Sequence, residues 1–119
     1  MRLNTEDTGN VVVITLGEPK LDATLSHEFK ELATAAARSD RNIYLLDVSS
    51  VTFMDSSGIG AIVGVMKVLG RNNRLELCGL TPAVRKVFRL TRMDKIFKLH
   101  ETREVALASH PAPVQATGT

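Results

Sequence analysis

The feature that most constrains the fold is the strand-length run of residues 43–48, which is apolar except for Asp47 and leads through a short polar turn into a nearly uncharged helix. Such a run is typical of a strand buried on both faces of a sheet. Residues 57–69 contain a single charged side chain, and Gly70 stands where a C-cap glycine ends a helix. Gly60 and Gly64 leave one side of this helix smooth, so we expect a neighbouring backbone to approach it closely. A helix with so few polar residues either is covered on both sides within the fold or has one side against a partner.

Strand patterns and helix patterns alternate along the rest of the chain. The predicted strands are residues 3–6, 10–16, 43–48, 74–78 and 96–99, and the predicted helices follow residues 21–24, span 57–69, begin at Thr81-Pro82 and span 102–108. The first two strands form a hairpin around Thr8-Gly9. The fold class is therefore α/β: a small single domain with a mixed β-sheet of about four to five strands, flanked by about four helices.

Length and composition agree with a single soluble domain. The chain has 119 residues, of which 44% are hydrophobic and 24% are charged. We expect the domain to cover residues 1–108 and residues 109–119 to form a disordered tail, because this segment contains two prolines and has no apolar period. No apolar stretch reaches about 18 residues and no signal peptide is recognisable, so we expect a cytoplasmic protein without membrane insertion.

Charge and cysteine content argue against several classes of function. The formal net charge is +2, and basic side chains gather between residues 85 and 98 in a chain that has one tyrosine and no tryptophan. A run of this kind is interpreted as a solvated helix face, so no nucleic-acid partner is expected. The one cysteine, Cys78, is interpreted as a small buried hydrophobic residue. No Cys/His cluster is visible along the chain, and we expect neither a metal nor a cofactor.

The motifs of common enzymes are incomplete. Gly58 and Gly60 fit the first two glycines of the dinucleotide-binding pattern G-x-G-x-x-G, but Val63 occupies the position of the third. The Walker A pattern is absent. Ser56 does not lie in a G-x-S-x-G motif. His27 falls on an exposed position of a predicted helix and His110 falls in the predicted tail, so neither is placed as a general base. We therefore expect no catalytic residues, and a nucleotide-hydrolysing enzyme is the least supported function.

An acid and two hydroxyls, Asp55, Ser56 and Ser57, mark the start of the uncharged helix. Side chains of these types cap the free backbone N–H groups of a helix, and the positive end of the helix dipole favours a phosphate. Asp22 and Asp55 could form a carboxylate pair, although helix capping alone explains both. A serine hydroxyl with no catalytic groups around it is either a plain N-terminal helix residue or the substrate of another enzyme.

The block F-M-D-S-S-G-I-G at residues 53–60 and the segment T-P-A-V-R-K-V-F-R-L-T at residues 81–91 resemble the anti-sigma factor antagonists of the STAS domain family. The resemblance runs from about residue 10 to residue 108, and Leu21-Asp22 falls where family members carry the same pair. It implies a small mixed sheet flanked by helices. The chain departs from the family pattern at residues 18–20, which replace a glycine-acid turn, and in its basic pI of about 8.9.

The resemblance implies a partner-switching function. Ser56 would be phosphorylated by an anti-sigma factor that is also a serine kinase of the histidine-kinase-like ATPase fold. The unphosphorylated protein, a monomer, would bind this kinase and free a sigma factor, and a PP2C-type phosphatase would restore it. The residues implied in partner binding are Asp22, Met54, Asp55, Ser57, Gly58, Ile59 and Val63.

The main alternative is a STAS accessory subunit that docks on the ATPase of a membrane transporter. The intact block Asp55-Ser56-Ser57-Gly58 favours the antagonist. A phosphate on Ser56 would add about −1.5 to −2 charges beside Asp55, in a contact that we expect to be partly apolar. The switch would then work through local charge and steric hindrance, with no change of fold.

Overall fold

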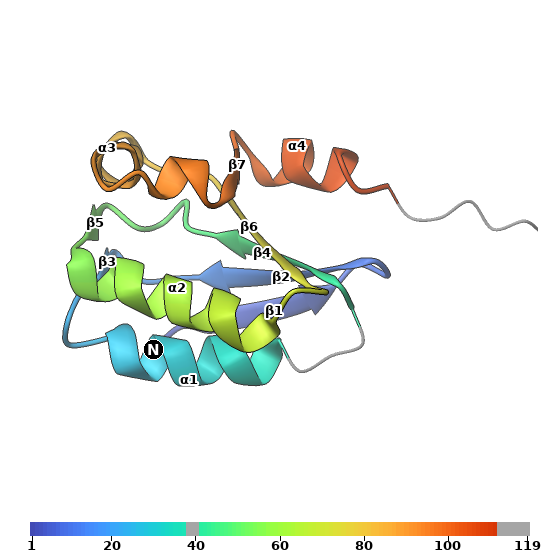
Figure 1. The fold of residues 1–119 in the computed structure, drawn as a ribbon, viewed down its shortest axis with the longest axis horizontal. Helices are drawn as coiled ribbons and strands as arrows, with labels where there is room; N and C mark the ends of the chain where they lie inside the picture. The colour runs from blue at the N-terminus through green and yellow to red at the C-terminus, as the bar shows by residue number, and fades with distance from the viewer. Residues whose placement is uncertain (38–40, 112–119) are drawn as a thin grey trace, which may run out of the picture.

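The computed structural model describes residues 1–37 and 41–111, and it places a five-stranded mixed sheet between layers of helices (Figure 1). In spatial order the strands are β1 (Leu3–Asp7), β2 (Val11–Leu16), β4 (Ile43–Asp47), β6 (Arg74–Cys78) and β7 (Lys98–His100). β1 pairs antiparallel with β2, and the other neighbouring strands are parallel. The helices are α1 (Ser26–Ala36), α2 (Ser56–Leu69), α3 (Pro82–Leu90) and α4 (Arg103–Ala108), with a 3-10 turn, η1 (Met93–Lys95). The predicted fold class is confirmed.

The centre of the sheet is the apolar run that the sequence analysis singled out. β4 lies between β2 and β6, and Tyr44, Leu45 and Leu46 are each at most 2% exposed. Successive residues of a strand face opposite sides of a sheet, so β4 contributes to two separate cores. Tyr44 and Leu46 pack in the larger core, and Leu45 packs in the smaller one.

The two cores belong to opposite faces of the sheet. On one face, α1 and α2 contribute residues such as Phe29 and Ile62, which are fully buried against alternate residues of the strands. On the other face, Ala106 of the short helix α4 packs on Val11, Val13, Leu45 and Cys78. The two layers of helices lie on either side of the strands in Figure 1. One face is therefore thickly covered and the other only by a six-residue helix.

Two short strands form a second sheet beside the first turn of α2. They are β3 (Lys20–Leu21) and β5 (Phe53–Met54), which pair in parallel. The sequence analysis did not predict them, because two residues carry too little periodic pattern. In Figure 1 both strands lie at the N-terminal end of α2, and β5 also contacts α3. This small sheet positions the candidate site described below.

Several boundaries differ from the predicted ones. The uncharged helix begins at Ser56 and not at Ser57, because Asp55 occupies the N-cap. The first two residues of the expected tail make contacts with the domain. Ser109 donates to the carbonyl of Ala106, and His110 contacts Glu76. Residues 112–119 of that tail lie outside the described residues, and the domain limit at residue 108 stays a prediction.

Within residues 1–37 and 41–111, no helix combines the length and the apolar character that a membrane crossing requires.

Candidate functional site

The candidate site is the first turn of α2. Asp55 has an extended backbone, and its carboxylate Oδ1 accepts a hydrogen bond of 3.1 Å from the N–H of Gly58. This is the N-cap that the sequence predicts, and it satisfies one of the free N–H groups of the helix. Ser56 is exposed and Ser57 is half-buried. Ser56 is therefore the first helical residue and not part of the turn, but its side chain is still open to solvent at the positive end of the helix.

The segment before α1 is fastened to this helix start by backbone hydrogen bonds. The carbonyl of Pro19 accepts from the N–H groups of Thr52 and Phe53, at 2.8 and 3.2 Å. Further along the same two segments, the N–H of Asp55 donates to the carbonyl of Leu21, with an N···O distance of 3.5 Å. Two segments about thirty residues apart, both of which the sequence analysis connected with partner binding, are thus parts of one surface.

Gly58 is the point of closest approach between these segments. A Cβ atom on this residue would lie 2.3 Å from the carbonyl oxygen of Leu21 and 2.9 Å from the side chain of Met54. The expected close backbone approach at Gly60 and Gly64 was wrong. Nothing lies within 4 Å of a Cβ on Gly60, and Gly64 faces the side chain of Lys30. The residue that has to be glycine is the one inside the first turn of α2.

Asp22 closes the turn that precedes α1. Its Oδ1 accepts from the hydroxyl of Thr24 at 2.6 Å and from the Thr24 N–H at 3.0 Å, while Leu25 occupies the N-cap position of α1. The hydroxyl of Thr24 holds the pKa of the Asp22 carboxyl below its ordinary value. Helix capping therefore explains Asp55, whereas Asp22 stabilises a turn that reaches the helix through Leu21.

Two of the residues expected to bind a partner have their side chains in the core. Met54 is 3% exposed and Ile59 is 8% exposed, so both shape the surface from below and do not present their side chains to a partner. The neighbouring Phe53 is 49% exposed. The sequence analysis missed Phe53, because a two-residue strand gives too little pattern to show that Phe53 and Met54 face opposite ways.

The outward side of α2 is a stripe of small or apolar residues that ends at one basic residue. Ser56, Gly60, Val63 and Lys67 follow one another at intervals of four, three and four, which places them on one face of a helix. Ser56, Gly60 and Lys67 are exposed and Val63 is half-buried. The opposite side packs into the larger core through Ile59, Ile62 and Val65. The sequence analysis left two explanations for this uncharged helix: cover on both sides within the fold, or a partner on one side. The fold covers only one side of the helix.

The histidines and the cysteine lie elsewhere. His27 is exposed, as expected, and its Nε2 lies 2.9 Å from the carboxylate of Glu31. His100 and His110 both contact Glu76 of β6, a cluster that the sequence analysis missed. Burial raises the pKa of the Cys78 thiol to about 12, so this residue is a buried, uncharged thiol. Its interpretation as a small buried residue is confirmed.

The comparisons with known proteins agree on one family. The family model of the STAS domain matches residues 2–106. The anti-sigma-B factor antagonist of Staphylococcus aureus is 26% identical over 87 residues, which cover 72% of this chain and 81% of that protein. Among solved structures, the STAS domain protein from Planctomyces limnophilus superposes with a TM-score of 0.84 at 22% identity, over 90% of this chain and 96% of that one, which shows the fold alone.

The anti-sigma factor antagonist SpoIIAA is also similar to this chain. Its unphosphorylated form has a TM-score of 0.72 at 28% identity, over 88% of this chain and 92% of that one. A structure of the phosphorylated form of this Bacillus protein has a TM-score of 0.69 at 26% identity, over 92% of this chain and the whole of that one.

The contact at Gly58 gives a test of the site's construction. We expect Gly58→Ala to lower the free energy of unfolding by about 1 to 3 kcal/mol, because the new methyl group collides with a backbone carbonyl that cannot rotate away. Gly60→Ala, two residues further along the same helix, should raise it by about 0.5 to 1 kcal/mol, since the position is open and alanine favours helix. Urea unfolding of both variants measures the difference. A Gly58→Ala variant as stable as the unchanged protein would contradict the described packing.

Proposed function

Since the chain belongs to the STAS domain family, we propose that it is an anti-sigma factor antagonist whose binding to its partner is controlled by a phosphate on Ser56. The observation that carries the proposal is the position of Ser56: an exposed hydroxyl on the first residue of a 14-residue helix, at the end of an outward stripe without acidic residues. The similarity to SpoIIAA, which has been solved in both phosphorylation states, supports it.

Ser56 suits modification better than Ser57. A kinase must reach the hydroxyl, and Ser56 is exposed while Ser57 is half-buried. The N-cap Asp55 uses its carboxylate on Gly58, which fixes the first turn and holds Ser56 at the surface. The phosphorylated residue is therefore Ser56.

The phosphate has opposite effects on the fold and on the interface. Within the monomer it lies at the positive end of α2, where a negative charge is stabilised by about 0.3 to 1 kcal/mol, and this offsets repulsion from Asp55. In a complex the same charge of about −1.5 to −2 would have to lose its water at an interface that we expect to include the exposed, apolar Phe53. Phosphorylation thus weakens binding and leaves the fold intact.

The partner surface consists of the first turns of α2 and the small sheet beside them. Phe53, Ser56, Ser57 and Val63 contact the partner directly, while Asp22, Asp55 and Gly58 keep the backbone in place. Met54 and Ile59 support this surface from the core. The partner is an anti-sigma factor that is also a serine kinase of the histidine-kinase-like ATPase fold, and a PP2C-type phosphatase removes the phosphate. The protein itself is a cytoplasmic monomer and not an enzyme.

The first test locates the phosphate. The protein is purified from the cells that naturally make it, as the unchanged chain and as the Ser56→Ala and Ser57→Ala variants, and its phosphopeptides are mapped by mass spectrometry. We expect phosphate on Ser56 in the unchanged chain and in Ser57→Ala, and none in Ser56→Ala. Phosphate on Ser57 would make the assignment wrong. An unmodified helix start under all growth conditions would favour the alternative of a transporter subunit.

The second test separates binding from folding. Ser56→Asp should weaken calorimetric binding to the kinase partner by at least about tenfold, because a charge must lose its water at the interface. Ser56→Ala should bind like the unphosphorylated protein. The unfolding free energy of both should change by less than about 1 kcal/mol.

The matched control is Asn72→Asp, which adds the same charge on an exposed turn beyond the other end of α2. It should bind normally. Equal binding by Ser56→Asp and the unchanged protein, or loss of binding only through unfolding, would refute the proposed switch.

A further inference from the structure

Three side chains of the types that can bind a metal ion meet at the edge of the face that α4 covers. Oε1 of Glu76 lies 2.7 Å from Nε2 of His100 and 2.8 Å from Nε2 of His110. One ligand atom from each residue lies within 4.8 Å of the others. The residues come from β6, from β7 and from the segment after α4, so only the folded chain brings them together.

Strand register explains how two of them meet. In the parallel pair of β6 and β7, Glu76 is opposite Lys98 and Cys78 is opposite His100. Glu76 and His100 are therefore diagonal neighbours on the same face, because residues two apart along a strand point the same way. His110 reaches them from the end of α4, and the side-chain amide of Asn10 donates to the His110 carbonyl.

The cluster is buried, and its hydrogen bonding is uneven. The side chains of Glu76, His100 and His110 are 2%, 5% and 14% exposed. Both imidazoles approach the same oxygen, Oε1, whereas the buried Oε2 makes no hydrogen bond within the described part of the chain. The guanidinium of Arg74 stands 3.1 Å from Oε2 and supplies charge compensation without hydrogen-bond geometry. Within the described residues the two oxygens thus differ: Oε1 has two imidazole nitrogens beside it, and Oε2 has an ion pair but lacks the hydrogen bond that a buried carboxylate oxygen ordinarily makes.

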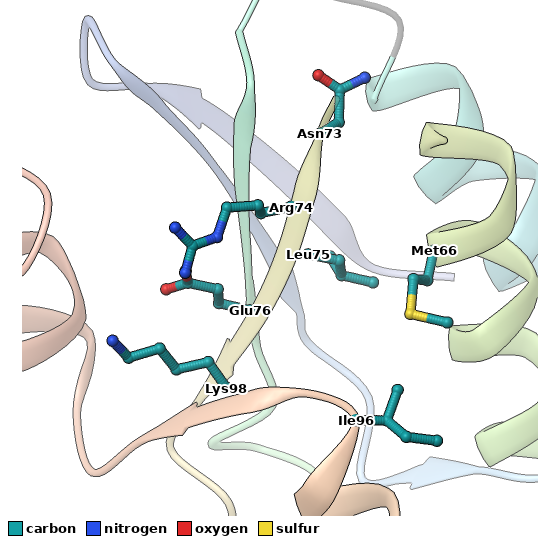
Figure 2. Close-up of a pocket in the computed structure, with 7 residues that line it drawn as sticks. All are labelled: Met66, Asn73, Arg74, Leu75, Glu76, Ile96 and Lys98. Atoms are coloured by element: carbon teal, nitrogen blue, oxygen red, sulfur yellow. The ribbon is translucent and has the colours of Figure 1, made fainter. Parts of the chain in front are cut away.

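The carboxylate also borders an open pocket. Figure 2 shows Arg74, Glu76 and Lys98 on one side of this pocket and Met66 with Ile96 on the other. Its volume is about 240 Å³, enough for several water molecules. Water or an ion can thus come close to Glu76 from outside the sheet.

We propose that Glu76, His100 and His110 bind one divalent transition-metal ion of the Zn²⁺ type through Oε1 and the two Nε2 atoms. Zn–N and Zn–O bonds of about 2.0 to 2.2 Å at tetrahedral angles separate the ligand atoms by about 3.3 Å. The two N···O distances then lengthen by about half an ångström, and each neutral imidazole carries its hydrogen on Nδ1. Two imidazoles with one carboxylate select Zn²⁺ over Mg²⁺ or Ca²⁺, and the positive Arg74 further disfavours a hard cation held by charge alone.

The bound ion cross-links parts of the chain that are distant in sequence. It joins two strands of the sheet to the segment after α4, a six-residue helix that is too short to be stable by itself. Because the ion binds the folded state and not the unfolded chain, its binding raises the thermal stability of the protein. The metal site does not involve Ser56, so its test is independent of the proposed function.

The test uses the full chain, freed of metal with a chelator and titrated with zinc chloride in a calorimeter. We expect one ion per chain and a higher melting temperature with zinc. His110→Ala, at the accessible end of the cluster, should lower the zinc affinity by at least about tenfold and abolish the rise in melting temperature. The matched control is His27→Ala, which removes an exposed histidine that also lies beside a glutamate and should change neither quantity.

A readout without substitutions accompanies the titration. In NMR spectra of the unchanged chain, zinc should shift the ring signals of His100 and His110 at equimolar concentration and leave those of His27 in place. Absence of stoichiometric binding by the unchanged chain would overturn the proposal. So would binding that survives His110→Ala and is lost in His27→Ala, because the ion would then sit on the surface of α1.

Discussion

The contact between Gly58 and the carbonyl of Leu21 is the constraint on which the candidate site depends. A side chain at position 58 would fill the space in which the segment before α1 meets the first turn of α2. Because the glycine leaves this space free, Asp55 can cap the helix while Ser56 stays at the surface. The exposed hydroxyl, the capping acid and the adjoining loop are thus joined by hydrogen bonds and close packing into one unit. Such a unit suits the proposed switch, because its backbone can keep the same shape whether or not Ser56 carries a phosphate.

The sequence was most informative where structure is local. The apolar run of residues 43–48, the hairpin before it and the cap at Asp55 all follow from neighbouring residues, and each is confirmed. Prediction failed where a side chain's surroundings come from distant segments. Met54 was expected at the surface, but the core of α1, α2 and the sheet covers it. The start of the helix was missed by one residue, within the usual uncertainty of helix ends.

The Glu76 cluster shows the same limit more clearly. Glu76 stands in a strand of alternating residues, where a charged side chain is ordinarily expected to face water. Its partners lie 24 and 34 residues further along the chain, and no local spacing connects them. Only the parallel pairing of β6 with β7 and the return of the chain after α4 bring two histidines onto one carboxylate oxygen. The two groups of side chains on which the proposals rest therefore lie in one small fold: an exposed hydroxyl at the start of α2 and a cluster of one carboxylate and two imidazoles at the edge of the sheet.

The central claim is that a phosphate on Ser56 changes the surface of the protein and not its fold. Amide NMR spectra of the unphosphorylated and phosphorylated protein, recorded under the same conditions, test it most directly. The account predicts that shifted signals are confined to the first turns of α2, to β5 and to the β3 segment that Gly58 contacts. Signals of β2, β4 and α4 should coincide in the two spectra. Shifts spread across the central sheet, or loss of signals from its core, would contradict the claim and indicate a rearrangement of the whole domain.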